Sequence, residues 1–213
     1  RQILKLGILT MDNQNLLVEN KGQCHIFETI ASEKERSSPY RLYRFLTDLE
    51  DILETIDDDY LRLRKIVPLV RQLLDDSPWL LLSMLTPNPE TGWDIMTLYD
   101  EPYFPITIQL VAWASGTVSR IHNHGCWGLV TLLSGQEKNT FWRRNPQPNS
   151  PDKIEKVGEQ ILNTGDMICF LPSAIHQIEA LGNEPTISLN LYGVTDFENR
   201  FEFDITSGTA RNF

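Results

Sequence analysis

The sequence predicts a mainly β fold, a barrel or sandwich of short strands, with α-helices before it in the chain. From residue 93 onward, short apolar or alternating runs are separated by glycine, proline and asparagine, the pattern of many strands joined by turns. Before the turn-rich segment at 86–92, apolar residues recur every three or four positions, which is the period of a helix. We therefore expect a helical segment at 1–90 that packs on a barrel at 91–213.

Two helices are expected before the barrel. The first begins at Ser38 and Pro39, a cap and first-turn pair. Its apolar stripe consists of Leu42, Leu46, Leu49, Leu53 and Ile56. The second covers about residues 60–74, and Pro68 is expected to kink or restart it because proline donates no backbone hydrogen bond. A short apolar turn, WLLLSML, opens after Ser77 and its neighbouring proline.

The barrel strands are expected where short runs are rich in β-branched, aromatic and other apolar residues. In chain order these runs are WDIMTLY, ITIQLVAW, GLVTLL, NTFWR, MICFL, HQIEAL and ISLNLYG. The long polar segment RNPQPNSPDK, at 144–153, is expected to be an exposed loop between two halves of the barrel.

Composition restricts the partners and the compartment. A formal net charge of −10 argues against binding to nucleic acid or to an anionic membrane, so an anionic substrate needs a local cation. No run approaches the roughly 18 apolar residues of a membrane span, and the first residues lack the long apolar core of a signal peptide. Three cysteines, Cys24, Cys126 and Cys169, without a CxxC spacing favour a reducing compartment, the cytoplasm.

Two histidines stand two residues apart in SRIHNHGCWG. Alternate residues of a strand face the same side, so His122 and His124 could offer both imidazoles to one ion inside a barrel. For an isolated pair the alternative is chance, or two buried histidines satisfied by hydrogen bonds. A later block, GDMICFLPSAIH, adds His176 eleven residues after Gly165.

These two blocks resemble the paired histidine signature of cupins, over roughly residues 93–205. The resemblance implies a cupin double-stranded β-helix, or jelly-roll barrel, that holds a divalent metal on His122, His124 and His176. Cupins usually have a glutamate shortly after the histidine pair as a fourth ligand, but here Gly128 and its neighbour occupy that stretch. Only three protein ligands therefore remain.

A site with three neutral imidazoles leaves several coordination positions open. Such a site suits the joint binding of a substrate and dioxygen to a redox-active metal, and Fe(II) is the expected cofactor. Zinc also accepts three histidines and a water, and the sequence does not decide against it.

A three-histidine cupin without the glutamate resembles the cysteine dioxygenase family, which includes the 3-mercaptopropionate dioxygenases. The run IHNHGCWGLVTLLSG, the late strand ISLNLYG and the helical segment before the barrel carry this resemblance, which spans about residues 39–204. It implies a non-haem Fe(II) dioxygenase that adds both atoms of O2 to a small thiol and gives a sulfinate. A three-histidine iron cupin acting on a non-thiol molecule, or a metal-binding cupin without turnover, are the alternatives.

The resemblance also suggests catalytic residues on the late strand, where the family carries a Ser-His-Tyr relay. Ser188, Asn190 and Tyr192 stand at these positions and share one face of the strand. Tyr192 is expected to donate a hydrogen bond to the substrate, although asparagine in place of histidine removes the titratable middle member. The alternative is a barrel tyrosine with a satisfied hydroxyl. The cysteine that some members join to this tyrosine aligns with Gly128, so we expect no crosslink, and Cys126 is taken as an ordinary buried thiol.

Substrate-binding residues are expected from the same resemblance. Cysteine dioxygenases hold the substrate carboxylate with an arginine that aligns with Met96, and a methionine cannot pair with a carboxylate. Arg200, eight residues after Tyr192, is the candidate replacement, unless it lies at the surface beside a glutamate. Arg143 and Arg144 are a third option, with a solvated rim as the alternative. The expected partners are a small molecule and O2, and the expected state is a monomer or small homo-oligomer.

Overall fold

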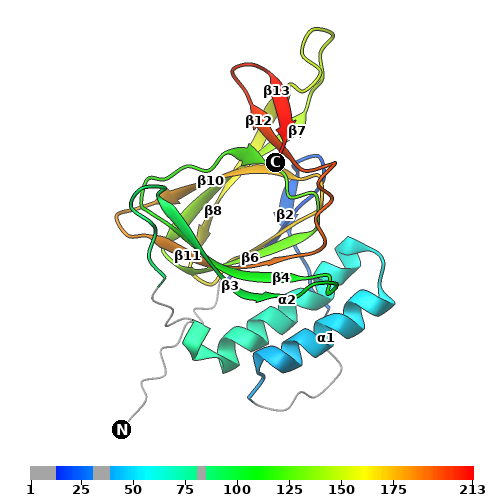
Figure 1. The fold of residues 1–213 in the computed structure, drawn as a ribbon, viewed down its shortest axis with the longest axis vertical. Helices are drawn as coiled ribbons and strands as arrows, with labels where there is room; N and C mark the ends of the chain where they lie inside the picture. Colours follow the sequence, from blue (N-terminus) through cyan, green and yellow to red (C-terminus); the bar gives the residue numbers. More distant parts are fainter. Residues whose placement is uncertain (1–12, 31–38, 81–84) are drawn as a thin grey trace.

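The computed structural model describes residues 13–30, 39–80 and 85–213, and it is mainly β (Figure 1). The helices are α1 (Leu42–Thr55), α2 (Asp59–Asp76) and the short 3-10 helix η1 (Pro78–Leu80). The strands are β1 (Asn15–Val18), β2 (Cys24–Ile26), β3 (Trp93–Asp100), β4 (Thr107–Trp113), β5 (Ile121–His122), β6 (Gly128–Ser134), β7 (Gln136–Arg144), β8 (Ile154–Asn163), β9 (Met167–Phe170), β10 (Ile175–Leu181), β11 (Thr186–Tyr192), β12 (Phe201–Asp204) and β13 (Thr209–Asn212).

The strands form two sheets with the connectivity of a jelly roll. One sheet has the order β2-β1-β9-β6-β11-β4-β3, and the other has the order β13-β12-β5-β10-β7-β8. From β4 to β7 successive strands alternate between the two sheets, and from β8 to β11 they alternate again in the return direction. This pairing of two four-stranded halves, β4-β11-β6-β9 and β5-β10-β7-β8, confirms the predicted jelly-roll barrel.

The helices pack on the outer face of the sheet that contains β4, β6 and β11 (Figure 1). Along β11, Leu189 and Leu191 are fully buried in one cluster with Phe45 and Leu49 of α1 and with a row of α2 residues. The alternate residues of β11 face the barrel interior, because side chains of a strand alternate between its two faces. The helices thus cover one face of β11, and its opposite face lines the interior of the barrel. Helices packed on the barrel were predicted, and the structure confirms them.

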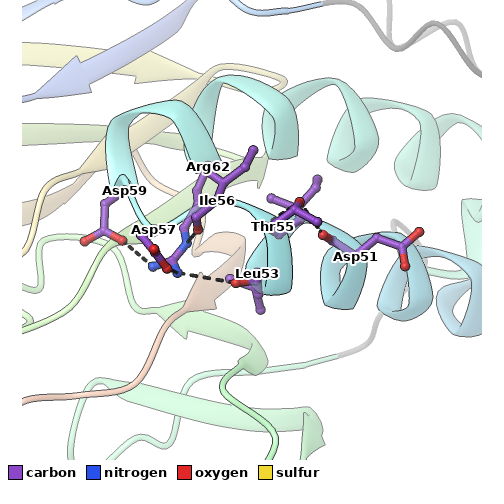
Figure 2. Close-up of polar contacts among 8 residues, drawn as sticks. Asp51, Leu53, Thr55, Ile56, Asp57, Asp59 and Arg62 are labelled. Carbon is purple, nitrogen blue, oxygen red and sulfur yellow. Dashed lines mark hydrogen bonds and ion pairs between the residues drawn. The ribbon is translucent and has the colours of Figure 1, made fainter.

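The junction between α1 and α2 is held by one arginine (Figure 2). The guanidinium of Arg62 donates to the carbonyls of Leu53 and Ile56 at the end of α1 and to Asp59 Oδ1, at 2.8 Å, at the start of α2. The carboxylate of Asp58 accepts a hydrogen bond from the backbone N–H of Leu61 at 2.8 Å, as an N-cap residue does. These contacts determine where one helix ends and the next begins.

Helix boundaries differ from the sequence-based expectation in two places. α1 begins at Leu42 with Arg41 at the N-cap, three residues after Pro39, and Ser38 lies outside the described residues. α2 continues through Pro68 as one helix, so the expected restart is wrong. Residues on both sides of Pro68, including Val67 and Leu69, are buried against the barrel, and their packing outweighs the loss of one backbone hydrogen bond. Within the described residues, no helix is both long and apolar enough to cross a bilayer.

Six strands lie outside the expected apolar runs. β1 and β2 precede the helices, and β1 pairs in parallel with β9 of the barrel. β5 is two residues long, β8 is a mostly polar edge strand, and β12 and β13 form a short hairpin. The segment at 144–153 is the hairpin loop between β7 and β8. It is mostly exposed and joins the strands β4–β7 to the returning strands β8–β11, so the expected loop between two halves of the barrel is confirmed. The domain division at residue 90 stays a prediction.

Candidate metal centre

The three predicted ligands meet inside the barrel. His122 ends β5 and lies directly opposite His176 of β10 in the antiparallel pairing of the two strands. His124 follows in the segment before β6, and its Nε2 lies 2.9 Å from Nε2 of His176. One ligand atom from each histidine lies within 4.8 Å of the other two. Metal–imidazole bonds of about 2.0–2.1 Å require such a close cluster, so the donor set fits one divalent ion.

The two neighbouring histidines converge although they do not lie on one strand. β5 ends at His122, and the residue that follows, Asn123, is buried. Its side-chain amide donates to the carbonyls of Pro172 and Asn199, and its oxygen accepts from the backbone N–H of Phe201. This anchor holds the chain between the two histidines. The expectation of two ligands on one strand is therefore wrong in its geometry, while their common direction is as expected.

In His122 and His176, the ring nitrogen Nδ1 lies at hydrogen-bond distance from an acceptor oxygen. Nδ1 of His122 lies 2.9 Å from the carbonyl oxygen of Arg120, and Nδ1 of His176 lies 2.9 Å from Oδ1 of Asn139. An acceptor at Nδ1 requires the proton there and leaves the lone pair of Nε2 free to bind a metal.

Electrostatics favour the neutral, metal-binding form of these rings. Burial lowers the pKa of His122, and burial together with the charge of His122 places the pKa of His124 and His176 well below the ordinary histidine value. Three imidazoles this close repel one another when protonated. The cluster is therefore uncharged near neutral pH, as ligands must be.

A cavity of about 620 Å³ contains the cluster and is large enough for a small molecule. Its wall includes the three histidines, Ser188, Asn190, Tyr192 and Arg200, and also Glu137 and Asn139. The catalytic and substrate residues predicted on β11 and at Arg200 thus lie at the same cavity as the metal ligands.

The late-strand residues form one wall of this cavity. The side-chain amide of Asn190 donates to the hydroxyl oxygen of Tyr192 at 3.1 Å, and the Tyr192 ring centroid lies 4.7 Å from that of His124. Burial raises the pKa of Tyr192 far above its ordinary value, so the phenol keeps its proton. Because its oxygen accepts from Asn190, the hydroxyl hydrogen is free to donate into the cavity. The catalytic roles of Ser188, Asn190 and Tyr192 stay predictions.

Gly128 provides the space for that tyrosine. The two residues are direct partners in the β6–β11 ladder, and a Cβ at position 128 would lie 3.1 Å from two ring carbons of Tyr192. Cys126 is buried and lies 3.8 Å from the hydroxyl of Thr195, and burial raises the pKa of its thiol. A thiol held in its protonated form agrees with its expected role as an ordinary buried cysteine.

Arg200 lies in the wall of the cavity that contains the three histidines. Its guanidinium carbon lies 4.1 Å from the ring centroid of Phe213, and its Nε is buried without a hydrogen-bond partner. Its charge lowers the pKa of His122 and His124 after the larger effect of burial. The alternative for Arg200 was an ion pair with a neighbouring glutamate at the surface. Glu202, two residues later in β12, pairs with Arg120 and Arg211.

The other substrate-binding candidates lie away from the cavity. Met96 is 43% exposed and pairs with Leu110, whose side chain is part of the core under the helices. Ile95, on the other face of β3, lines the cavity instead. Met96 was expected beside the substrate. The pairing of β3 with β4 instead turns its side chain away from the cavity.

Arg143 and Arg144 have partners at the end of the β7–β8 hairpin. Arg143 pairs with Glu155, and Arg144 pairs with Asp152 and lies over the rings of Phe201 and Phe203. Neither arginine is part of the cavity wall. Both arginines thus lie in the solvent-exposed rim, which was the alternative expected for them.

Glu137 and Asn139 are buried polar residues at the cavity that were not anticipated from the sequence. They are 2% and 1% exposed and lie on β7, which begins at Gln136, three residues earlier than the predicted strand NTFWR. In the longer strand, positions 137, 139 and 141 alternate toward the interior. The alternation in QEKNTF is the signal that could have located them.

No family model matches the chain. Among solved structures, it is similar to an oxalate oxidase in complex with the substrate analogue glycolate, at 12% identity and a TM-score of 0.41, over 54% of this chain and 57% of that one. It is also similar to a cupin superfamily protein from Desulfitobacterium hafniense DCB-2, at 20% identity and a TM-score of 0.40, over 55% and 88% of the two chains. A cupin 2 conserved barrel domain protein from Salinispora arenicola CNS-205 matches at 13% identity and a TM-score of 0.37, over 52% and 88%. The similarity spans a little over half the length of the oxalate oxidase chain.

Proposed function

We propose that this protein is a non-haem Fe(II) dioxygenase of the cysteine dioxygenase type, which oxidises a small thiol to its sulfinate with O2. The observation that carries the proposal is a cluster of three histidines, to which the described part of the chain adds no carboxylate ligand, in a cavity that also contains Tyr192 and Arg200. The reaction balances as one thiol and one O2 giving one sulfinic acid. When bound at the histidines, Fe(II) would supply the redox chemistry for this transfer.

Arg200 is proposed to hold the carboxylate of the substrate. Its Nε is a buried donor without a partner, and its charge acts on His122 and His124, so it lies close to the metal ligands. A guanidinium matches a carboxylate with two parallel hydrogen bonds. In a chain with a net charge of −10, this local cation is what an anionic substrate requires.

Tyr192 is proposed to orient the bound substrate by a hydrogen bond. Asn190 donates to the tyrosine oxygen and thereby leaves the hydroxyl hydrogen to point into the cavity. The ring of Tyr192 is also close to that of His124, so a group bound at the metal lies within reach of the hydroxyl. Asn190 has no proton to exchange near neutral pH, which makes the pair a positioning device and leaves proton transfer to solvent or substrate.

A second candidate function uses the same centre on a small molecule that is not a thiol. It is favoured by the apolar wall that Trp93, Ile95 and Trp113 contribute, and by the asparagine at position 190. A metal-binding protein without turnover is the third candidate. The cytoplasmic location and the monomeric or small homo-oligomeric state also stay predictions.

The test is oxygen consumption by purified protein loaded with Fe(II) under anaerobic conditions. Cysteine, 3-mercaptopropionate, mercaptosuccinate and cysteamine are each supplied, and O2 uptake is compared with sulfinate formed. We expect equal amounts of the two for at least one carboxylate thiol, and slower reaction with cysteamine, which has no carboxylate. Iron-loaded protein that is silent with every thiol overturns the proposal and supports a non-thiol substrate or a binding protein. Failure to bind iron removes the oxygenase function itself.

A further inference from the structure

The barrel interior contains a carboxylic acid that the proposed reaction does not use. Glu137 of β7 is 2% exposed and lies in the cavity wall. A carboxylate removed from water is costly unless hydrogen bonds or nearby charge compensate for its lost hydration. The residues that surround Glu137 therefore indicate the role of this buried acid.

Glu137 is joined to a metal ligand by a chain of two hydrogen bonds. The side-chain amide of Asn139 donates to Oε1 of Glu137 at 2.9 Å, and the carbonyl oxygen of the same amide lies 2.9 Å from Nδ1 of His176. The two β7 residues are two positions apart, so both point inward, and His176 lies on the neighbouring strand β10.

The charge of the acid determines the direction of this chain. An ionised carboxylate only accepts hydrogen bonds, so the NH2 group of Asn139 must face Glu137 and its oxygen must face His176. The amide oxygen in turn only accepts, so Nδ1 of His176 carries the proton and Nε2 presents its lone pair to the ion. Without the acid, the amide of Asn139 could turn over and donate to Nδ1, which would put the proton on Nε2 and block metal binding.

His122 does not depend on side chains in this way. Its Nδ1 faces the backbone carbonyl of Arg120, which is an acceptor in every state of the protein. Of these two histidines, only His176 has a tautomer that depends on side chains, those of Glu137 and Asn139.

We propose that Glu137 and Asn139 are positioning residues that hold His176 in its metal-binding tautomer. When Glu137 is ionised, they also place a negative charge behind the ligand, in a site where the described residues provide no carboxylate ligand. This inference rests on the metal centre of the proposed function.

The ionised form of Glu137, which this role requires, is favoured by the bound metal. Burial raises its pKa to about 7, while the hydrogen bond from Asn139 acts in the opposite direction. A divalent cation at His176 favours the ionised carboxylate. The ion and the acid therefore stabilise each other across the amide.

The test is the affinity of the protein for Fe(II), titrated anaerobically, and for Co(II), followed by its visible absorption. Glu137→Gln should raise both dissociation constants by about 10–100-fold, the usual effect of removing a partner of a ligand. The matched control is Glu179→Gln, which removes one negative charge from the outer face of β10, where Glu179 pairs with Lys138, and should leave both constants unchanged.

A double variant separates the proposed role from a general effect on packing. Asp in place of Asn139 can only accept, so Glu137→Gln combined with Asn139→Asp should restore the affinity and the Co(II) spectrum. Wild-type affinity in Glu137→Gln overturns the inference, and so does a folded double variant that is as weak as the single one. If Glu137→Gln does not fold, as judged by its circular dichroism, the double variant decides alone. A wild-type protein that binds neither metal instead overturns the proposed function.

Discussion

At the scale of single residues, each candidate metal ligand is held in place by a different contact. His122 is held by a backbone carbonyl, His176 by a side-chain amide, and His124 by the buried Asn123 that anchors the chain beside it. His176 is the most enclosed of the three, at 4% exposed, and it comes from a strand remote in sequence from the other two. It closes the site, so its removal is the sharpest test of the ligand set.

His176→Ala should abolish stoichiometric iron binding. Two remaining imidazoles do not provide enough donors to retain the ion against water. Metal content after anaerobic loading and desalting measures the effect, with Tyr192→Phe as a control that keeps its iron. Full iron content in the His176 variant would show that the third ligand is another residue.

Tyr192→Phe should keep the metal and slow turnover. The variant retains the ring beside Gly128 and loses the hydroxyl, so only the hydrogen bond into the cavity disappears. A hydrogen bond of about 1–3 kcal/mol corresponds to a decrease of roughly 5–150-fold in kcat. Initial rates of O2 uptake at saturating thiol test this, and an unchanged kcat would return Tyr192 to the role of a structural barrel tyrosine.

Arg200→Ala should raise KM for carboxylate thiols by roughly tenfold or more and leave kcat little changed, because it removes binding that ground state and transition state share. Cysteamine lacks the carboxylate and should be unaffected. Arg143→Ala is the control, since Arg143 pairs with Glu155 at the hairpin rim. A matching loss with cysteamine would contradict the role of Arg200 in carboxylate binding.

At the scale of elements, the α1–α2 junction positions the helical layer beneath the barrel. Arg62, with a side chain 19% exposed, bonds to carbonyls at the end of α1 and to Asp59 in α2. α2 is tied to the barrel as well, because the guanidinium of Arg71 donates to the carbonyl of Gly165 and to the side chain of Asn15. The helices therefore support the outer face of β11, whose inner face carries the candidate catalytic residues.

Arg62→Ala should lower the free energy of unfolding by about 1–3 kcal/mol, since it leaves partly buried carbonyls unpaired. Denaturant unfolding measures the change. Arg44→Ala, at an exposed position of α1, should show no comparable loss. Iron content should stay at the wild-type level in both variants, and loss of iron in Arg62→Ala would show that the helical layer shapes the metal centre directly.

At the scale of the whole molecule, the barrel cavity brings several titratable groups together. Burial favours neutral histidines and a protonated tyrosine, and the cavity wall also contains ionisable side chains, among them Arg200, Glu202 and Glu137. The pKa of Glu137, at about 7, is above the value of 4.5 for an unfolded glutamate. Between these two pH values the folded, metal-free protein binds more protons than the unfolded chain.

The stability of metal-free protein should therefore depend on pH through Glu137. As pH rises from about 4.5 to about 7, this group makes folding progressively less favourable, and above that range its cost is constant. The histidines act in the opposite direction below pH 6.5, so the measurement is the difference between wild type and Glu137→Gln, in which their contribution cancels. Wild type should lose unfolding free energy relative to the variant across this window. A constant difference would mean that Glu137 titrates normally.

The spacing of the histidines, together with the resemblance of their two sequence blocks to the cupin signature, predicted the candidate ligand set. Histidine is a metal ligand by its chemistry, and the order of His122, His124 and His176 with short apolar strands around them points to one barrel interior. The alternation in ISLNLYG likewise placed Ser188, Asn190 and Tyr192 on one face. These features are local, because the period of a strand is contained in a few consecutive residues.

Only the tertiary structure decided which neighbouring residues face the cavity. Ile95 rather than Met96 points inward because of the register between β3 and β4, which the local sequence does not contain. A glutamate such as Glu137 would be expected at the surface. It is buried here because β7 pairs with both β8 and β10. The histidines and their spacing are local features and indicate which atoms can bind a metal. The side chains that surround them depend on long-range strand pairing, because the direction of a side chain into the barrel is set by a strand together with its partners.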